Sequence, residues 1–257
     1  MKSPKVVIFC GGMGTRLKEE TEYKPKPLVE VGGLPILWHI MKLYSFYGMK
    51  DFILCLGYKG DMIKEFFMHY DWKAFDFTLN LKSKGITFHE SDIEDWNITF
   101  VDTGQETLIG GRLKQVEKYV DTDIFHVTYG DGVSDINLNS LSQFHAKQGK
   151  IGTITCVRPH SKYGVVRVKK DLITHFKEKP ILDDYVNGGF MVFHRSVFAH
   201  VIETRMLEDG TLPLLVEKNE LAGYIHDGFW YAMDTYKDYT DLNKMHSSGS
   251  HPWMVWK

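Results

Sequence analysis

Glycines and cations near the start of the chain have the types and spacing of a phosphate-binding site. A glycine-rich loop, Gly11-Gly12-Met13-Gly14-Thr15, leads directly into Arg16, and a second cation, Lys26, stands between two prolines. Glycines let the backbone approach phosphate oxygens closely, so that loop N–H groups can bind them. Arg16 adds a permanently charged planar donor, and Lys26 adds a cation that can meet charge growing during a reaction. Together these residues predict a triphosphate site.

Two aspartates far apart in the chain form a candidate metal site. Asp131 follows the apolar run Phe125–Tyr129 and a glycine, and Asp234 follows an aromatic run in the stretch GFWYAMDT. Ligands of open α/β sheets bind at the carboxyl ends of the strands, which is where such carboxylates lie. Mg²⁺ takes one or two protein carboxylates and fills its remaining positions with phosphate oxygens and water. The alternative role for either aspartate is to cap a turn or a helix.

Short apolar runs alternate with helical patterns along the chain, as they do in α/β proteins. The predicted strands are Val6–Cys10, Phe52–Leu56, Phe125–Tyr129, Ile151–Val157, Gly164–Val168, Ile173–Phe176 and Gly189–Phe193, and the predicted helices are Pro35–Tyr47 and Asp61–Tyr70. This order predicts a Rossmann-like, doubly wound sheet that is mostly parallel. The glycine loop then follows the first strand, and Asp131 follows a central one.

Composition narrows the class of protein without deciding it. The chain has 257 residues, 43% of them hydrophobic, a net charge of -2 and a pI near 6.6. These values suit a substantial core and give no reason to expect a nucleic acid or an anionic membrane as partner. No apolar run is long enough to span a bilayer, no signal peptide opens the chain, and the three cysteines are widely spaced. We therefore expect a cytoplasmic protein.

Three other classes can be weighed against these motifs. A dehydrogenase is disfavoured, because Leu17 stands where the dinucleotide fingerprint needs Gly or Ala. The loop also lacks the Gly-Lys-Ser/Thr of a Walker A motif. A metal-dependent glycosyltransferase usually carries an Asp-x-Asp pair, whereas Gly130-Asp131-Gly132 supplies one acid. A non-catalytic nucleotide-sensing subunit would keep the fold and lose charged residues, yet Arg16, Lys26 and both aspartates are present.

Several motifs together resemble the sugar-phosphate nucleotidyltransferase family, and within it the cytidylyltransferases. They are GGMGTRL (11–17), KPKPLVEVGGLPILWHI (24–40), WNITFVDTG (96–104), GGRLKQVEKYV (110–120), TYGDGVSDI (128–136), FKEKP (176–180), NGGFMVF (187–193) and GFWYAMDT (228–235). The likeness spans nearly the whole chain and implies a GT-A-like mixed sheet. It also implies CTP and a sugar 1-phosphate, first of all α-D-glucose 1-phosphate, as substrates, Mg²⁺ as cofactor and a homo-oligomer.

The resemblance assigns roles to residues within these motifs. The implied catalytic residues are Arg16, Lys26 and Asp131, and the implied metal ligands are Asp131 and Asp234. The implied nucleotide-binding residues are Phe9, Cys10, Gly11, Gly12, Met13, Gly14, Thr15, Arg16, Lys26, Thr107, Arg112 and Gly130. The implied sugar-phosphate-binding residues are Glu178, Lys179, Asn187 and Gly188. Two of these have plain alternatives, since Thr107 could cap a helix and Arg112 could lie on a solvated face.

One stretch departs from the family pattern. Residues 208–215 read EDGTLPLL, where cytidylyltransferases tend to have an acidic Glu-x-Glu-Pro stretch. Another hexose phosphate or a heptose phosphate therefore stays open as the acceptor, and UTP or dTTP stays open as the nucleotide.

No repeat or low-complexity linker divides the chain. We expect one nucleotidyltransferase domain over residues 1–245, with its acceptor-binding half at 150–230, and a C-terminal tail over 246–257. Residues 71–95 predict a small β-rich excursion that lies over the nucleotide site or reaches toward a neighbouring subunit. The tail carries Trp253 and Trp256, which predict packing against the domain or against a second subunit.

Overall fold

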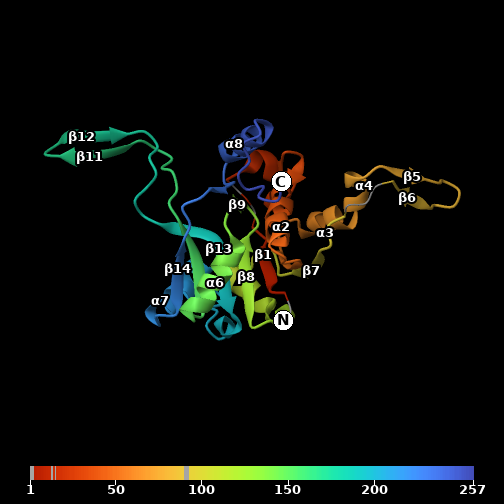
Figure 1. Cartoon of the computed structure of the whole chain (residues 1–257), viewed down its shortest axis with the longest axis horizontal. Coiled ribbons are helices and arrows are strands. Elements are labelled where there is room, and N and C mark those ends of the chain that lie inside the picture. The colour runs from red at the N-terminus through yellow and green to blue at the C-terminus, as the bar shows by residue number, and fades with distance from the viewer. Residues whose placement is uncertain (1–2, 13, 15, 90–92) are drawn as a thin grey trace.

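A mixed seven-stranded sheet forms the centre of the protein (Figure 1). The computed structural model describes residues 3–12, 14, 16–89 and 93–257. Strand order is β14-β10-β13-β8-β1-β4-β7. These strands are β1 (Lys5–Phe9), β4 (Asp51–Leu56), β7 (Asn97–Asp102), β8 (Ile124–Tyr129), β10 (Gly152–Val157), β13 (Val186–His194) and β14 (Leu221–Ile225). Every neighbouring pair is parallel except those that β13 forms with β8 and β10, which confirms the predicted mostly parallel sheet.

The central strands are largely apolar because helices cover both faces of the sheet, although β8 also buries His126 and Thr128. Val6 and Ile8 pack on one face, in a cluster with residues of α2 (Ile36–Phe46) and α6 (Leu138–Gln148). Val7 packs on the other face, with residues of α5 (Ile109–Gln115) and α7 (Leu212–Glu217). Successive side chains of a strand point to opposite faces, so a strand buried on both sides favours a near-continuous apolar run. The doubly wound arrangement is thus confirmed.

Shorter elements connect these layers. They are α1 (Lys18–Thr21), η1 (Lys26–Leu28), β2 (Glu30–Val31), β3 (Leu34–Pro35), α3 (Gly60–Met68), α4 (Tyr70–Ala74), η2 (Glu117–Tyr119), β9 (Gly132–Ser134), η3 (Arg195–Ala199), the π-helical turn η4 (Leu207–Thr211), β15 (Trp230–Ala232) and α8 (Tyr236–Ser247). Each predicted strand and helix is present within a few residues. The elements that were not predicted include the sheet strands β7 and β14, the short strands β2, β3, β9 and β15, and the helices α6, α7 and α8. Within the described residues, none of the helices is both long enough and apolar enough to cross a bilayer.

Two β-hairpins extend from opposite sides of the sheet (Figure 1). One pairs β5 (Phe77–Leu79) with β6 (Ile86–Phe88), and the other pairs β11 (Val165–Lys169) with β12 (Leu172–Lys177). The first hairpin confirms a β-rich excursion within residues 71–95, of which 90–92 lie outside the described residues. It projects away from the sheet rather than over it.

The C-terminal tail folds back onto α2. Trp253 is only 1% exposed, and its indole N–H donates to Nδ1 of His39 at 3.4 Å. Nε2 of His39 lies 2.8 Å from the carbonyl of Val31, so this nitrogen carries the proton and Nδ1 is free to accept. Burial lowers the pKa of His39 to about 4, which keeps the ring neutral at physiological pH. Trp256 packs edge-on against Trp38, so both tail tryptophans contact their own chain.

Candidate active site

The ends of two parallel strands bring the glycine loop and Asp131 to the same edge of the sheet. β1 leads into Cys10 and the loop, and the neighbouring β8 leads into Gly130 and Asp131. The N–H of Gly130 donates to the carbonyl of Phe9 at 3.0 Å. A Cβ atom at position 130 would lie 3.0 Å from that same oxygen, so a side chain there would require the neighbouring backbone to shift by a few tenths of an ångström.

A second, smaller sheet delivers Asp234 to the same place. β9 follows Asp131 and pairs antiparallel with β15, with Gly132 opposite Ala232. Just beyond this pair, the N–H of Met233 donates to the carbonyl of Asp131 at 2.9 Å. The two aspartates, distant in sequence, therefore lie side by side.

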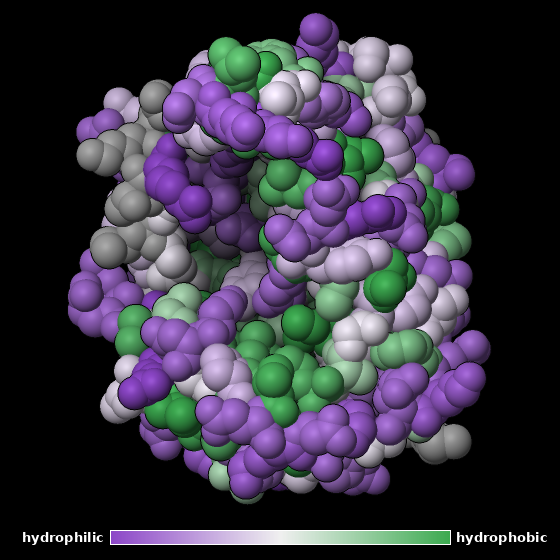
Figure 2. All heavy atoms as spheres, turned by 90° about the vertical axis from the view of Figure 1, so that its left-hand side faces the viewer, coloured by the Kyte–Doolittle hydropathy of each residue, from purple (hydrophilic) through white to green (hydrophobic). Residues whose placement is uncertain are grey.

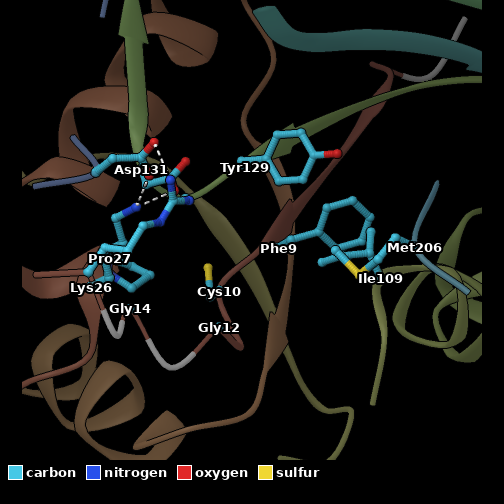
Figure 3. A pocket seen from close by; sticks show the side chains of 13 residues that line it. Phe9, Cys10, Gly12, Gly14, Lys26, Pro27, Ile109, Tyr129, Asp131 and Met206 are labelled. Carbon is cyan, nitrogen blue, oxygen red and sulfur yellow. Dashed lines mark hydrogen bonds and ion pairs between the residues drawn. The ribbon is translucent and has the colours of Figure 1, made fainter. Parts of the chain in front are cut away.

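Lys26 lies between the two aspartates. Its ammonium is 2.7 Å from Oδ2 of Asp131 and 2.9 Å from Oδ1 of Asp234 (Figure 3). Pro25 is extended and Lys26 opens the η1 turn, whose next residue, Pro27, is buried and anchors the turn. Arg16 joins the group, with Nη1 3.3 Å from Oδ2 of Asp234. Two cations and two carboxylates thus form one cluster with no net formal charge.

The contacts within the cluster keep Lys26 and Asp234 ionised. Burial alone would lower the pKa of Lys26, but the neighbouring Asp131 and Asp234 outweigh burial, and the pKa is raised. Burial alone would raise the pKa of Asp234, but the hydrogen bond and charge of Lys26, with Arg16 and Lys162 behind them, leave it lowered. Both groups are therefore charged near neutral pH, ready to meet a phosphate or a metal ion.

A cavity of about 340 Å³ opens beside the cluster and takes in most of the predicted nucleotide site. It is lined by Phe9, Cys10, Gly12, Gly14, Arg16, Lys26, Pro27, Ile109, Tyr129, Gly130, Asp131, Met206 and Asp234. Figure 3 shows Lys26 and Asp131 at one end, with Phe9, Ile109 and Met206 gathered at the other. A molecule with an anionic part and a flat apolar part matches this division.

A second cavity, of about 380 Å³, adjoins the first and contains two of the predicted acceptor residues. Its lining consists of Arg16, Thr128, Tyr129, Asp131, Gly132, Asn187, Gly188, Gly189, Phe190, Glu208, Trp230, Ala232 and Asp234. Because β13 runs antiparallel to β8, Asn187 and Gly188 at its start lie at the edge where β8 ends. Figure 2 shows a hollow in one face of the molecule, with hydrophilic residues along one side and hydrophobic residues on the other.

Some predicted site residues lie elsewhere. Glu178 and Lys179 stand at the base of the β11–β12 hairpin, and neither lines the two cavities. Thr107 precedes α5 without contributing a side-chain cap to it, and it lines neither cavity. Met13 and Thr15 lie outside the described residues. The contacts proposed for all of these residues stay predictions.

Arg112 lies behind the glycine loop, where it is 3% exposed. Its Nη1 donates to the carbonyl of Leu56 at 2.9 Å and to Oγ1 of Thr103 at 2.6 Å. Its Nη2 donates to the carbonyls of Gly11 and Gln105, each at 3.2 Å. The guanidinium therefore ties the loop backbone to the ends of β4 and β7. Arg112 therefore does not lie on a solvated helix face, which was the alternative considered above, but is a buried anchor for the loop.

Removing this anchor should destabilise the protein. Buried acceptors that lose their donor are costly, so we expect Arg112→Ala to lower the free energy of unfolding by about 3 kcal/mol, as measured by urea denaturation. Arg158→Ala is the matched control, because Arg158 pairs with Asp227 at the surface and such pairs contribute about 0–1 kcal/mol. Wild-type stability combined with a loss of nucleotide affinity would instead indicate a direct contact between Arg112 and the nucleotide.

Sequence reasoning missed several residues that line the cavities. Tyr129 lies in TYGDGVSDI directly before the predicted Gly130, and Trp230 lies in GFWYAMDT four residues before the predicted Asp234, so these two motifs carry a usable signal. Ile109 and Met206 are apolar residues outside the chosen positions, and Glu208 belongs to a stretch read only as a departure from the family. Nothing in their local sequence indicates that they face a cavity.

The carboxylates of Asp131 and Asp234 fit a hard divalent cation. Their oxygens converge on a single positively charged atom, Nζ of Lys26, and oxygen ligands are those that Mg²⁺ prefers. Within the described residues there is no group of three or more His, Cys, Asp or Glu side chains able to hold a metal. Two carboxylates suit an ion that takes its other ligands from substrate phosphates and water.

Comparison with known proteins identifies the family. The nucleotidyl transferase family model matches residues 5–248. The glucose-1-phosphate cytidylyltransferase of Salmonella typhimurium is 43% identical over 256 residues, covering 98% of this chain and 100% of that protein. The mannose-1-phosphate guanyltransferase of Candida albicans is 30% identical over 94% of this chain and 66% of its own length.

The fold points the same way. The crystal structure of UDP-glucose pyrophosphorylase complexed with UDP-glucose superimposes with a TM-score of 0.70, at 15% identity, over 96% of this chain and 100% of that one. A family model that covers almost the whole chain, a sheet of the same architecture and a charged cluster between two cavities agree with one another. The chain belongs to the nucleotidyl transferase family.

Proposed function

We propose that this protein transfers the cytidylyl group of CTP to α-D-glucose 1-phosphate, giving CDP-glucose and pyrophosphate. The observation that carries the proposal is the pair of adjoining cavities, because Arg16, Asp131 and Asp234 line both of them. Two anionic substrates, one in each cavity, would meet at these residues. The identity of the nucleotide and of the sugar is supported by the 43% identity to a glucose-1-phosphate cytidylyltransferase.

The reaction asks for positioning and charge rather than for a general base. A phosphate monoester has a second pKa of about 6, so the sugar phosphate is mostly a dianion at neutral pH. One of its oxygens forms a bond to the α-phosphorus of CTP while the bond from that phosphorus to the departing pyrophosphate breaks in line. Lys26 and Arg16 would hold the phosphates and stabilise the negative charge that accumulates between them.

Mg²⁺ is the cofactor we propose, held by Asp131 and Asp234. The charged cluster is neutral without substrates, so a bound triphosphate and sugar phosphate call for further positive charge. When bound, the ion would supply that charge and orient the phosphate oxygens. Asn187 and Gly188 would line the sugar side, and Phe9, Cys10, Gly12, Gly14 and Gly130 the nucleotide side. A cytoplasmic location stays a prediction.

We also propose that the protein is a homo-oligomer, with the hairpin β11–β12 covered by a second copy. Every residue of β11 and β12 is exposed, including Leu172 at 70% and Phe176 at 62%. An isolated two-stranded hairpin is marginally stable in water, and exposed apolar patches of this kind mark contact surfaces. A neighbouring copy of the same hairpin also gives Glu178 and Lys179 a way to reach a cavity that they do not reach in their own chain.

Charge placed on this hairpin should reduce the oligomer. We expect the double substitution Leu172→Lys and Phe176→Lys to lower the molar mass measured by light scattering on a sizing column, because lysines resist burial in an apolar contact. Met68→Lys is the control, since Met68 is equally exposed at 74% but lies on α3. A wild-type protein with the mass of one chain, or an unchanged mass in the double variant, would contradict the proposal.

Release of pyrophosphate tests the function directly. The assay combines CTP, UTP, dTTP, ATP or GTP with glucose 1-phosphate and with a panel of other hexose and heptose phosphates, with and without Mg²⁺. We expect the highest kcat/KM for CTP with glucose 1-phosphate. Turnover with another acceptor or another pyrimidine nucleotide would change the proposed substrate but support the same type of reaction. Nucleotide binding without turnover of any pair would instead identify a sensing subunit.

A further inference from the structure

The second cavity, of about 380 Å³, is called the acceptor cavity below, and the first is called the nucleotide cavity. The acceptor cavity contains a carboxylate, that of Glu208, which is not part of the charged cluster. Glu208 lines this cavity together with Asn187 and Trp230, but it does not line the nucleotide cavity. It lies on η4, a π-helical turn, and such turns occur often at functional sites. Glu208 therefore lines the same cavity as the predicted acceptor residues Asn187 and Gly188, where it could contact the sugar phosphate.

The backbone that carries Glu208 is anchored on both sides. Leu207 before it is fully buried, and so is Thr211 at the end of the turn. Oγ1 of Thr211 accepts from the N–H of Ile202 at 3.2 Å, and the carbonyl of Asp209 accepts from Nη1 of Arg205 at 3.2 Å. The turn is thus tied to the preceding loop, so the Glu208 side chain projects from a fixed point.

Tyr129 fixes the side chain itself. The hydroxyl of Tyr129 donates a hydrogen bond to Oε1 of Glu208. Burial, reinforced by the charge of Glu208, raises the pKa of Tyr129, so the hydroxyl keeps its proton and remains a donor. In Figure 3 this hydroxyl points away from Asp131. Glu208 is therefore held on the side of Tyr129 that faces away from the phosphate cluster, with further lone pairs free to accept.

Charge then decides which part of a sugar phosphate Glu208 can meet. Among the residues that the structure describes, Arg16 is the cation that lines this cavity, and its guanidinium lies beside Asp234. The phosphate therefore belongs at that end. A carboxylate repels a phosphate but accepts hydrogen bonds strongly from hydroxyls. The indole N–H of Trp230 already donates to the carbonyl of Gly188 at 2.7 Å, so that ring offers the sugar a nonpolar wall. Glu208 is thus a charged acceptor for sugar hydroxyls in this cavity, beside Asn187, whose Oδ1 already accepts from the N–H of Gly189 at 3.0 Å.

We propose that Glu208, positioned by Tyr129, determines acceptor specificity by accepting hydrogen bonds from ring hydroxyls of the sugar phosphate. The proposal rests on the proposed function and deepens it. Glu208 belongs to residues 208–215, the stretch that departs from the family pattern. In this role it would distinguish sugar phosphates by the positions of their hydroxyl groups.

Deoxy acceptors provide the test. We would measure kcat/KM for glucose 1-phosphate and for its 2-, 3-, 4- and 6-deoxy analogues with the wild type, Glu208→Ala and Tyr129→Phe. A hydrogen bond to a charged group affects binding by about 10- to 100-fold. We expect the wild type to lose that factor for the analogue without the recognised hydroxyl. Glu208→Ala should show that same loss of kcat/KM with glucose 1-phosphate, and its kcat/KM should be equal for glucose 1-phosphate and the deoxy analogue. The kcat/KM of Tyr129→Phe for glucose 1-phosphate should lie between those of the wild type and Glu208→Ala.

Two controls separate recognition from folding. Asp209→Asn removes the neighbouring exposed carboxylate, which does not line the cavities, and should leave the acceptor profile unchanged. The affinity of Glu208→Ala for CTP, measured by calorimetry, should equal that of the wild type. An equal loss of kcat/KM for every acceptor would overturn the role of Glu208.

If the wild type were active only with another sugar phosphate, that sugar phosphate would replace glucose 1-phosphate as the proposed acceptor. Deoxy analogues of that sugar would then test the role of Glu208 in the same way. A wild type without turnover would refute the proposed function. Glu208 would then be tested by calorimetric binding of glucose 1-phosphate, where equal affinity in the wild type and Glu208→Ala overturns the proposal.

Discussion

Lys26→Ala should lower kcat for cytidylyl transfer by about 1,000-fold and leave the affinity for CTP within about tenfold of wild type. The ammonium of Lys26 lies beside both carboxylates at the junction of the two cavities, where negative charge accumulates as the phosphates approach. An interaction that strengthens mainly in the transition state lowers kcat when it is removed, whereas binding of the ground state changes little. Pyrophosphate release gives kcat, and calorimetry with CTP gives the affinity.

Lys24→Ala is a closely matched control for this prediction. Lys24 belongs to the same proline-flanked segment, but its ammonium pairs with Glu30 at 3.1 Å and it lines neither cavity. Its substitution should leave kcat and CTP affinity unchanged. If Lys26→Ala lost affinity and kcat by equal factors, Lys26 would be a ground-state phosphate ligand and not a transition-state one.

Asp131→Asn should have an effect of similar size, about 1,000-fold on kcat/KM. An amide keeps the shape of the side chain but loses the charge that would hold Mg²⁺, and it leaves Lys26 with Asp234 as its remaining carboxylate. The defect should depend on the metal, so that the concentration of Mg²⁺ giving half-maximal rate rises together with the loss of rate. Steady-state kinetics over a series of Mg²⁺ concentrations measures both quantities.

Asp61→Asn serves as the control for that series. Asp61 is an exposed carboxylate at the start of α3, paired with Lys64 on the helix surface, and its substitution should change neither rate nor metal dependence. An Asp131→Asn enzyme that loses rate but keeps the wild-type Mg²⁺ dependence would remove Asp131 from the metal site.

The parts of the site that sequence could predict are those where a strand end fixes the position of a residue. β1 is largely apolar, β8 is apolar apart from the buried His126 and Thr128, and glycines and charged residues follow both strands. The residues that meet at this edge of the sheet could therefore be predicted from the pattern. Lys26 was recognisable from its proline-flanked setting. The strands β7 and β14 were missed because they lie at the edges of the sheet and are only partly buried, which leaves a weak hydrophobic signal.

The parts that sequence could not predict depend on packing between distant segments. Arg112 looks like any helical arginine in sequence, and its role as a buried anchor follows only from the carbonyls of Leu56, Gly11 and Gln105 converging on it. Glu208 faces the acceptor cavity because a π-helical turn directs it there and Tyr129 holds it. Neither arrangement has a periodic pattern along the chain.

The ammonium of Lys26 acts as a counter-ion that the protein carries within itself. Because it already occupies the space between Asp131 and Asp234, a free divalent ion has to compete with a covalently attached cation for the same oxygens. A bound triphosphate would offer Lys26 other partners and would free the carboxylates. We therefore expect the protein without nucleotide to bind divalent metal weakly, and its apparent affinity for the metal to rise with nucleotide concentration. In that case the protein would respond to the metal–nucleotide complex rather than to the ion alone.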